Sequence, residues 1–394
     1  MDQDSNYQEP YESASCNYFS RGVCGSCSLL SLAPGARIRS KELRLHDLAN
    51  RLLVPHERVL PIISPEHPWE SRRKIKMSVT GTSEAACIGI VRRDFSSVDL
   101  TDCPLTPTPI RELLHEVKRL IATYKLTPYS ITNRTGELKH LIVMSNQALS
   151  SAILRFVLRS SDFVSRIEQC AREIQAQFPW VQVVSCNIQP LPAALLEGPE
   201  EILLSEATHL REVYGDIPLY LSPQSFMQVT PSIATRLYKR AAEAAAPHKF
   251  ERALDLYCGA GGFSLHLANH VGKVTGVELS ESAIAAATRS ASEIGASNVS
   301  FVSNSAEHYL ASLANPTPDL ILVNPPRRGL TEEVLTTICK LKPTAVFYSS
   351  CNPETFARDC EVLQRQYEVT EITPFDMFPL TEHMELFATF SRRP

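Results

Sequence analysis

Several features that would narrow the class of this 394-residue chain at once are missing from its sequence. No apolar run reaches the length of a membrane span, so we expect no membrane association. No hydrophobic leader precedes the polar first fifteen residues, which we expect to be disordered, and the 11 cysteines therefore do not indicate the disulfide framework of a secreted protein. The net charge of −4 lacks the basic excess that is typical of nucleic-acid-binding proteins. These absences favour a cytoplasmic globular protein.

What is present indicates an α/β protein with more than one domain. The length predicts about two or three domains, and 44% hydrophobic residues can fill a full core. From about residue 225, apolar strands alternate with amphipathic helices, which is typical of a doubly wound parallel sheet. Before it, periodicity predicts helices over 36–54 and 162–178 and strands over 72–103, 138–145, 152–158, 181–190 and 201–204. We therefore divide the chain into a disordered segment 1–15, a central domain 16–224 and a second domain 225–394.

A glycine-rich loop follows an apolar strand in the second domain. It reads Leu254-Asp255-Leu256-Tyr257-Cys258-Gly259-Ala260-Gly261-Gly262-Phe263, and an amphipathic helix follows it. A second strand, 273–278, ends on Glu278 roughly 20 residues further on, a spacing that suits hydrogen bonds to a ribose diol. Because Gly-Ala-Gly-Gly differs from the dinucleotide pattern G-x-G-x-x-G, the loop favours S-adenosylmethionine over a nicotinamide cofactor. A plain βαβ turn is the alternative interpretation.

Two further apolar strands of this domain end on polar residues. The strand 319–323 leads into Asn324-Pro325-Pro326, where a rigid turn would place the Asn324 amide over the sheet edge, within reach of a planar base. The strand 345–348 leads to Cys351, so its thiol would lie at a carboxyl end, where open α/β sheets bind ligands. A thiolate there would be a nucleophile beside a bound cofactor. The alternatives are a tight turn at Asn324 and a buried, unreactive cysteine at Cys351.

Four cysteines have a spacing that suits a metal centre. Cys16, Cys24 and Cys27 read C-x7-C-x2-C, and Cys103 follows in Thr101-Asp102-Cys103-Pro104-Leu105. Four thiolates suit either a [4Fe–4S] cluster or tetrahedral zinc, and the spacing does not choose between them. A disulfide pair or an unligated CxxC is the alternative. Most of the other seven cysteines we assign to the core.

Four motifs of the chain occur together in a recognisable order. They are Asp255 to Phe263, Asn324 to Gly329, Tyr348 to Asn352, and Phe375-Asp376-Met377-Phe378-Pro379. From about Cys16 to the C-terminus the chain resembles the RNA uracil-5-methyltransferase family, and within it the iron–sulfur branch that acts on 23S ribosomal RNA. The resemblance implies a Rossmann-like class I methyltransferase domain, S-adenosylmethionine as methyl donor and 23S ribosomal RNA as partner. It also favours a [4Fe–4S] cluster over zinc.

The resemblance implies a role for individual residues. Cys351 matches the nucleophile that adds to C6 of uracil, and Glu385, in Thr381-Glu382-His383-Met384-Glu385-Leu386, matches the acceptor of the C5 proton. The target uracil must leave its stack to be reached. The cluster ligands would be Cys16, Cys24, Cys27 and Cys103, and the cofactor contacts would be Gln228, Tyr257, Glu278 and Asn324.

The chain departs from the family pattern at three points. Many relatives have Asp where Asn324 stands and Phe where Tyr257 stands, although Asn is typical of the 23S branch. No N-terminal β-barrel module precedes the cysteines, so the grip on RNA must come from the central domain. Local basic clusters there suit phosphate contacts, although a solvated face is the alternative. They are Arg72, Arg73, Lys74 and Lys76; Arg92 and Arg93; and Arg37, Arg39, Lys41 and Arg44.

Three other functions remain as alternatives. The first is the same chemistry on transfer RNA. The second is an amino-methyltransferase, which also uses Asn-Pro-Pro, but those enzymes place an aromatic residue where Arg327 stands here. The third is an RNA-binding protein that is stabilised by a metal centre and has an inactive methyltransferase fold. The presence of both Cys351 and Glu385 argues against this third function. We expect a monomer.

Overall fold

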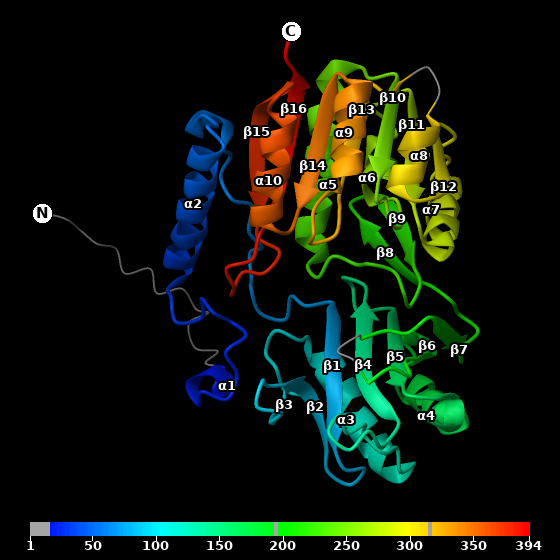
Figure 1. Ribbon diagram of the computed structural model, residues 1–394. Coiled ribbons are helices and arrows are strands. Elements are labelled where there is room, and N and C mark those ends of the chain that lie inside the picture. The colour runs from blue at the N-terminus through cyan, green and yellow to red at the C-terminus, as the bar shows by residue number, and fades with distance from the viewer. Residues whose placement is uncertain (1–15, 193–195, 314–316) are drawn as a thin grey trace, which may run out of the picture.

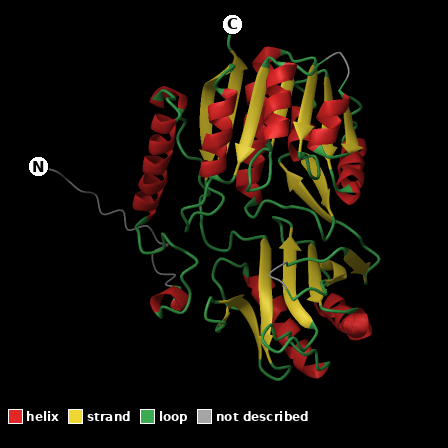
Figure 2. Cartoon of the chain, viewed as in Figure 1, coloured by secondary structure: helices red, strands yellow, loops and turns green. Residues whose placement is uncertain are grey.

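The computed structural model describes residues 16–192, 196–313 and 317–394, so the segment 1–15 that we expect to be disordered lies outside the described residues. The described chain contains two seven-stranded sheets and a two-stranded ribbon between them. The two sheets lie end to end, each with its own helices (Figures 1 and 2). Within the described residues, no helix has both the length and the hydropathy needed to cross a bilayer.

The first sheet has the strand order β3-β2-β1-β4-β5-β6-β7, and only the β5–β6 pair is parallel. Strand β1 alternates as the sequence predicted: Ile75, Met77 and Val79 face the core, and Lys74 and Lys76 lie on the other face. Helices α3 and α4 pack on the core face. The elements are β1 (Lys74–Gly81), β2 (Ala86–Val91), β3 (Ser97–Asp99), α3 (Thr108–Thr123), β4 (Leu138–Ser145), β5 (Ala152–Leu158), η2 (Ser161–Phe163), α4 (Val164–Gln177), β6 (Val181–Ile188) and β7 (Glu200–Leu203).

The second sheet has the order β12-β11-β10-β13-β14-β16-β15. The first five strands of this order, from β12 to β14, run parallel to one another. Strand β16 pairs antiparallel with both of its neighbours, β14 and β15. Its strands and helices are α5 (Pro231–Ala245), η3 (Ala246–His248), β10 (Arg252–Leu256), α6 (Gly262–Leu267), β11 (Lys273–Glu278), α7 (Glu281–Glu293), β12 (Val299–Ser303), α8 (Ala306–Ser312), β13 (Leu320–Val323), α9 (Glu332–Leu341), β14 (Ala345–Ser350), α10 (Pro353–Leu363), β15 (Tyr367–Phe375) and β16 (Glu385–Arg392).

Helices cover both faces of this second sheet. Residues of α8, α9 and α10 pack on one face and residues of α5, α6 and α7 on the other. Strand β13, Leu-Ile-Leu-Val, is buried at every position, because a parallel strand between two helical layers has no solvated face. The predicted doubly wound, mostly parallel sheet is confirmed.

The N-terminal helix α2 (Pro34–Arg51) packs on the second sheet, although we predicted this segment within the 16–224 domain. Leu45, Leu48 and Ala49 join the core that α9 and α10 form with the sheet. The chain then runs along β15, with bridges from Val59 and Ile63 to that strand. The remaining elements are α1 (Asn17–Ser20), η1 (His56–Arg58), β8 (Leu210–Tyr214) and β9 (Ile217–Leu221). Helix α2 and the C-terminal strands β15 and β16 therefore share one core.

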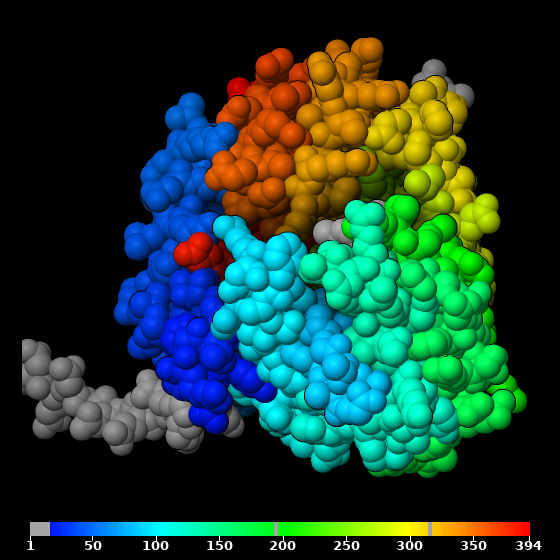
Figure 3. Space-filling view, turned by 60° about the horizontal axis from the view of Figure 1, so that its bottom comes forward, coloured from blue at the N-terminus to red at the C-terminus, as the bar shows by residue number. Residues whose placement is uncertain are grey.

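A small apolar cluster joins the two sheets. Met144, Ile153 and Val183 of the first sheet contact Met227 and Ala260 of the segment around the glycine loop. Figure 3 shows that the N-terminal segment, the first sheet and part of the C-terminal region meet on one face. The first sheet is therefore packed beside the loops that follow the strands of the second.

Candidate active site and metal centre

Four of the residues singled out in the sequence lie at the same edge of the second sheet. Tyr257, Glu278, Asn324 and Cys351 follow directly after or end the strands β10, β11, β13 and β14. The chain leaves β10 toward β11 and β12 on one side and returns through β13 and β14 on the other, so this edge contains a topological switch point. In Figure 1 the edge faces the first sheet.

The glycine loop and Glu278 are held together by hydrogen bonds. The backbone N–H of Gly259 donates to Oε2 of Glu278 at 3.3 Å, and Oε1 accepts from Leu279 N at 2.8 Å. Tyr257 has a φ of 61°, which is uncommon for a residue with a side chain, and Gly261 has a φ of 85°, which favours glycine. The acid is thereby oriented next to an open backbone turn, as a ribose-binding carboxylate requires.

Gln228 lies beside the same loop. It is 6% exposed, in the segment between β9 and α5. Its neighbour Met227 packs in one cluster with Ala260 of the glycine loop. Of the four predicted cofactor contacts, Gln228 is thus the one that comes from outside the strand ends.

Asp255, which we did not single out as a functional residue, is fully buried beneath the glycine loop. Its Oδ2 accepts a hydrogen bond from Ser264 Oγ at 2.6 Å, and its Oδ1 has no partner within the described residues. Burial raises the pKa of this carboxyl to about 7. The sequence feature that could have identified Asp255 is an acidic residue inside an otherwise apolar strand, Leu254-Asp255-Leu256.

The segment around Asn324 is fastened to the loop that carries Cys351. Asn324 N donates to Leu256 O at 3.3 Å, which connects it to the end of β10. Asn352, the N-cap of α10, donates through Nδ2 to Arg327 O at 3.0 Å. The two loops that were separate motifs in the sequence therefore form one structural unit.

Cys351 and Glu385 lie close enough for their charges to interact. Burial is the largest influence that raises the pKa of the Cys351 thiol, the Glu385 carboxylate raises it further, and the Arg327 guanidinium lowers it. Glu385, at the start of β16, is 4% exposed, and burial raises its pKa to about 7. Ser349 Oγ donates to Glu385 Oε1 at 2.6 Å. A thiol, a buried carboxyl and a cation thus gather where β14 ends.

The four cysteines predicted as metal ligands come together as well. Cys16 precedes α1, Cys24 and Cys27 lie in the loop after it, and Cys103 follows β3; all four line one cavity of about 220 Å³. Burial raises the pKa of Cys27 to about 11, and the nearby Arg72 guanidinium lowers it. Within the described residues, no three His, Cys, Asp or Glu side chains stand close enough to share one metal ion.

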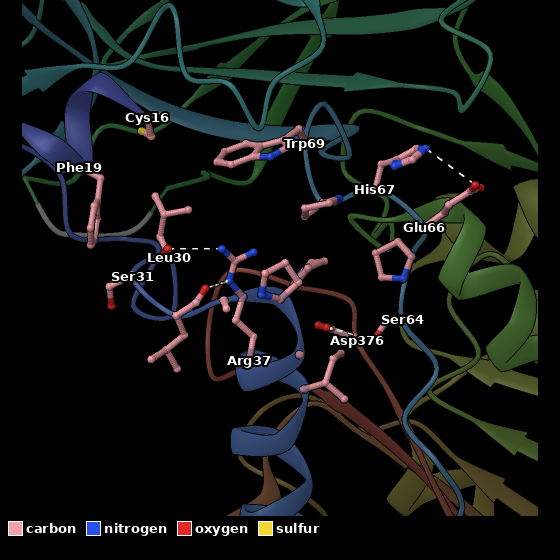
Figure 4. Close-up of a pocket in the computed structure, with 18 of the residues that line it drawn as sticks. Cys16, Phe19, Leu30, Ser31, Arg37, Ser64, Glu66, His67, Trp69 and Asp376 are labelled. Atoms are coloured by element: carbon pink, nitrogen blue, oxygen red, sulfur yellow. Dashed lines mark hydrogen bonds and ion pairs between the residues drawn. The ribbon is translucent and has the colours of Figure 1, made fainter. Parts of the chain in front are cut away.

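A larger cavity of about 950 Å³ adjoins the cysteines (Figure 4). Cys16 lines both cavities, and Trp69 and Asp376 line the larger one from other parts of the chain. The Arg37 guanidinium donates to the carbonyls of Leu29, Leu30 and Leu32 and so fixes one wall. Asp376, in the loop that follows β15, and the predicted ligand Cys16 thus line the same cavity.

The prediction that the basic cluster at 72–76 contacts phosphate is wrong for two of its four cations, Arg73 and Lys74. Arg73 is 8% exposed and donates to Glu70 O and Gln147 O. Lys74 donates to Ser225 O at 2.8 Å, and burial lowers its pKa to about 8. Lys76 is exposed but forms an ion pair with Glu197 at 2.5 Å. Lys74 and Lys76 are directed to protein acceptors because the segments after β9 and β6, respectively, cover that face of the sheet.

Comparison with known proteins agrees with this arrangement. The family model of the tRNA (uracil-5-)-methyltransferases matches residues 217–393. The chain is 41% identical over 373 residues to the 23S rRNA (uracil(747)-C(5))-methyltransferase RlmC of Shewanella amazonensis, which covers 94% of this chain and 96% of the relative. It is 39% identical over 379 residues to the RlmC of Pectobacterium atrosepticum, which covers 96% and 99%.

One solved structure is similar over most of the chain. It is the Pyrococcus abyssi tRNA (uracil-54, C5)-methyltransferase in complex with S-adenosyl-L-homocysteine, with a TM-score of 0.76 and 25% identity over 92% of this chain and 85% of that one. The fold and the grouped residues define a class I methyltransferase. The chain belongs to the RNA uracil-5-methyltransferase family, as its motifs indicated.

Proposed function

We propose that this protein methylates C5 of a uridine in 23S ribosomal RNA, with S-adenosylmethionine as the methyl donor. The observation that carries the proposal is that the Cys351 thiol, after β14, and the buried Glu385 carboxyl, at the start of the adjacent strand β16, lie near one another at the edge that holds the glycine loop. Relatives that match nearly the whole chain are named for uracil 747 of 23S rRNA, which supports the corresponding uridine as the target.

The residues account for each step of this reaction. The Cys351 thiolate adds to C6 of the flipped uracil, and the electron pair of the C5–C6 double bond makes C5 a nucleophile. Bound S-adenosylmethionine would supply an electrophilic methyl group, which C5 takes while the electron pair of the broken S–CH3 bond stays on the sulfur of the departing S-adenosylhomocysteine. Glu385 then removes the C5 proton; the C–H electron pair re-forms the double bond, the C6–S bond breaks, and its pair returns to the sulfur of Cys351.

The environment of the two groups suits these steps. A carboxyl with a pKa of about 7 is partly ionised at neutral pH, so Glu385 can accept a proton that an ordinary surface glutamate would hold poorly. Burial holds the Cys351 pKa above its usual value, and the Arg327 guanidinium opposes that effect and favours the thiolate. Arg327 occupies the place where an amino-methyltransferase would have an aromatic residue, which disfavours that alternative.

We assign the cofactor contacts to Gln228, Tyr257, Glu278 and Asn324. Glu278 would bind the ribose hydroxyls, since its carboxylate is already oriented by backbone N–H groups of the loop. Asn324 would present its amide at the sheet edge beside the same loop. The placement of these residues around the switch point supports the assignment.

We also propose that Cys16, Cys24, Cys27 and Cys103 hold a [4Fe–4S] cluster. In such a cluster each thiolate binds a different iron, so the sulfurs stand further apart than they do around one zinc ion. Four cysteines around one cavity support a centre with four thiolate ligands, and the resemblance to the iron–sulfur branch of the family favours the cluster over zinc. In this proposal 16–224, apart from the helix α2 that packs on the second sheet, carries the cluster and contacts RNA, 225–394 carries the chemistry, and a monomer acts in the cytoplasm.

The same chemistry on transfer RNA is the second candidate, because the family model and the similar solved structure are both named for tRNA. The test is to incubate the purified protein and S-adenosylmethionine with ribosomal and transfer RNA from a deletion strain, and to map the products by mass spectrometry. We expect one 5-methyluridine in 23S rRNA. Methylation of tRNA alone would establish the second candidate, and a methyl group on a base amine would overturn both.

A further inference from the structure

Strand β14 contains a buried hydroxyl next to the candidate proton acceptor. All six residues of β14 are buried, and Ser349 is 0% exposed. A hydroxyl within a sheet core is unfavourable unless it forms a hydrogen bond. Ser349 Oγ forms one with Glu385 Oε1, at 2.6 Å, across the antiparallel β14–β16 pair.

The donor to the Glu385 carboxyl belongs to a fully buried strand, β14. Ser349 lies on β14 itself, two residues before Cys351, which follows the end of that strand. Within the described residues, Ser349 is the only side chain that donates to Glu385, and no cation pairs with it. Oε1 is therefore engaged, and Oε2 is left for a proton.

The groups that face Glu385 add no competing positive charge. The Cys351 thiol, after the end of β14, and the Tyr238 phenol, on α5, lie near enough to interact electrostatically with it. From β15, the residue opposite Glu385 in the register is the apolar Phe375. Among the groups that the structure describes, the Ser349 hydroxyl is thus the one interaction that favours the ionised carboxylate, against burial, which favours the protonated form.

We propose that Ser349 is a positioning residue for proton removal: its hydroxyl fixes Oε1 of Glu385, orients Oε2 toward the C5 proton and favours the ionised carboxylate. This inference rests on the proposed function, since it assigns Glu385 the role of base. The proton passes from C5 to Oε2, while the hydrogen of the Ser349 hydroxyl stays on its oxygen.

The main test is the Ser349→Ala variant in single-turnover methylation across the pH range from about 6 to 9. Without the donor the ionised form is less favoured, so we expect the acidic limb of the rate profile to move upward by about one pH unit. The rate would fall roughly fivefold near pH 7 and recover at high pH. An acidic limb that coincides with that of the wild type would overturn the proposal.

Two variants separate the hydroxyl from general effects on the fold. Ser349→Thr keeps the donor and should keep the wild-type limb; a shift as large as that of Ser349→Ala would overturn the proposal. Thr389→Val removes another buried hydroxyl from β16, one that bonds Thr370, and should leave the limb in place. If Ser349→Ala does not fold, Ser349→Cys provides a weaker donor of similar size, and we expect a smaller upward shift.

An infrared titration of the RNA-free protein gives a readout that does not depend on turnover. The carbonyl band of protonated Glu385 is identified by its loss in Glu385→Gln, and its midpoint should rise in Ser349→Ala. An unchanged midpoint would overturn the inference about Ser349 even if the wild type methylates uridine normally. A wild type that methylates no uridine would instead refute the proposed function, while the titration would still report on this hydrogen bond.

Discussion

Lys41 of helix α2 lies 2.5 Å from Asp376, and both side chains are almost completely buried, at 1% and 2% exposure. The same ammonium donates to the carbonyls of Phe378 and His383, at 3.0 and 3.2 Å. All three acceptors belong to the loop between β15 and β16, and Glu385, the first residue of β16, follows this loop directly. An N-terminal helix thus holds the loop that positions the candidate base.

We predict that Lys41→Met lowers the free energy of unfolding by about 3–5 kcal/mol, because it leaves the Asp376 carboxylate buried without its partner. Urea unfolding measures the change. Arg44→Met is the matched control on the same helix: its pair with Glu382 is exposed, so its loss should change stability by about 1 kcal/mol or less. Equal effects from the two variants would contradict a structural role for the buried pair.

We predict that Glu278→Ala weakens S-adenosylmethionine binding roughly tenfold, because hydrogen bonds from ribose hydroxyls to a carboxylate are lost. Isothermal calorimetry measures the dissociation constant. Glu281→Ala, in the first turn of α7, removes a nearby acid that we do not assign to the cofactor, and its affinity should match the wild type. Unchanged affinity in Glu278→Ala would place the cofactor elsewhere.

We predict that protein purified without oxygen is brown and contains iron and acid-labile sulfide. If the cluster is structural, Cys24→Ser should lose iron and stability together, since metal binding contributes to the folding free energy. Cys339→Ser, far from the cysteine cavity in sequence and on helix α9, should keep the full iron content. Stoichiometric zinc without labile sulfide would rule the cluster out.

The Glu385 carboxyl should make stability depend on pH. Its pKa is raised from 4.5 to about 7 by burial, so between these values the folded state binds more protons than the unfolded state. Stability therefore falls as pH rises through this window, by up to about 3 kcal/mol. Glu385→Gln should remove this loss and be more stable than the wild type at pH about 8, with little difference near pH 4.5. Urea unfolding that gives the same difference at both pH values would contradict the assigned shift.

Local sequence patterns predicted much of the fold. The strands expected at 138–145, 152–158 and 273–278 have those same bounds. Helix α3 was missed, although Ile110, Leu113 and Leu114 begin an apolar spacing that continues along one helical face. These elements depend on periodicity, which is a property of neighbouring residues.

The remaining features depend on partners that are distant in the sequence. Lys41 looked like part of a basic surface cluster, but its acceptor is 335 residues away. Lys74 likewise has its acceptor at Ser225. A run of cations shows that charge is present and does not show which carbonyl or carboxylate will face it. The motifs at Tyr257, Asn324 and Cys351 were recognisable because each follows its own strand.

The most direct test of the covalent mechanism is a denaturing gel of the protein incubated with S-adenosylmethionine and labelled 23S rRNA fragment. Glu385→Gln can add the thiol and transfer the methyl group but cannot remove the C5 proton, so we predict an RNA adduct that survives denaturation. Cys351→Ala should neither methylate nor form the adduct, and Cys351→Ala combined with Glu385→Gln should form none. An adduct in the double variant, or full turnover by Cys351→Ala, would contradict the account.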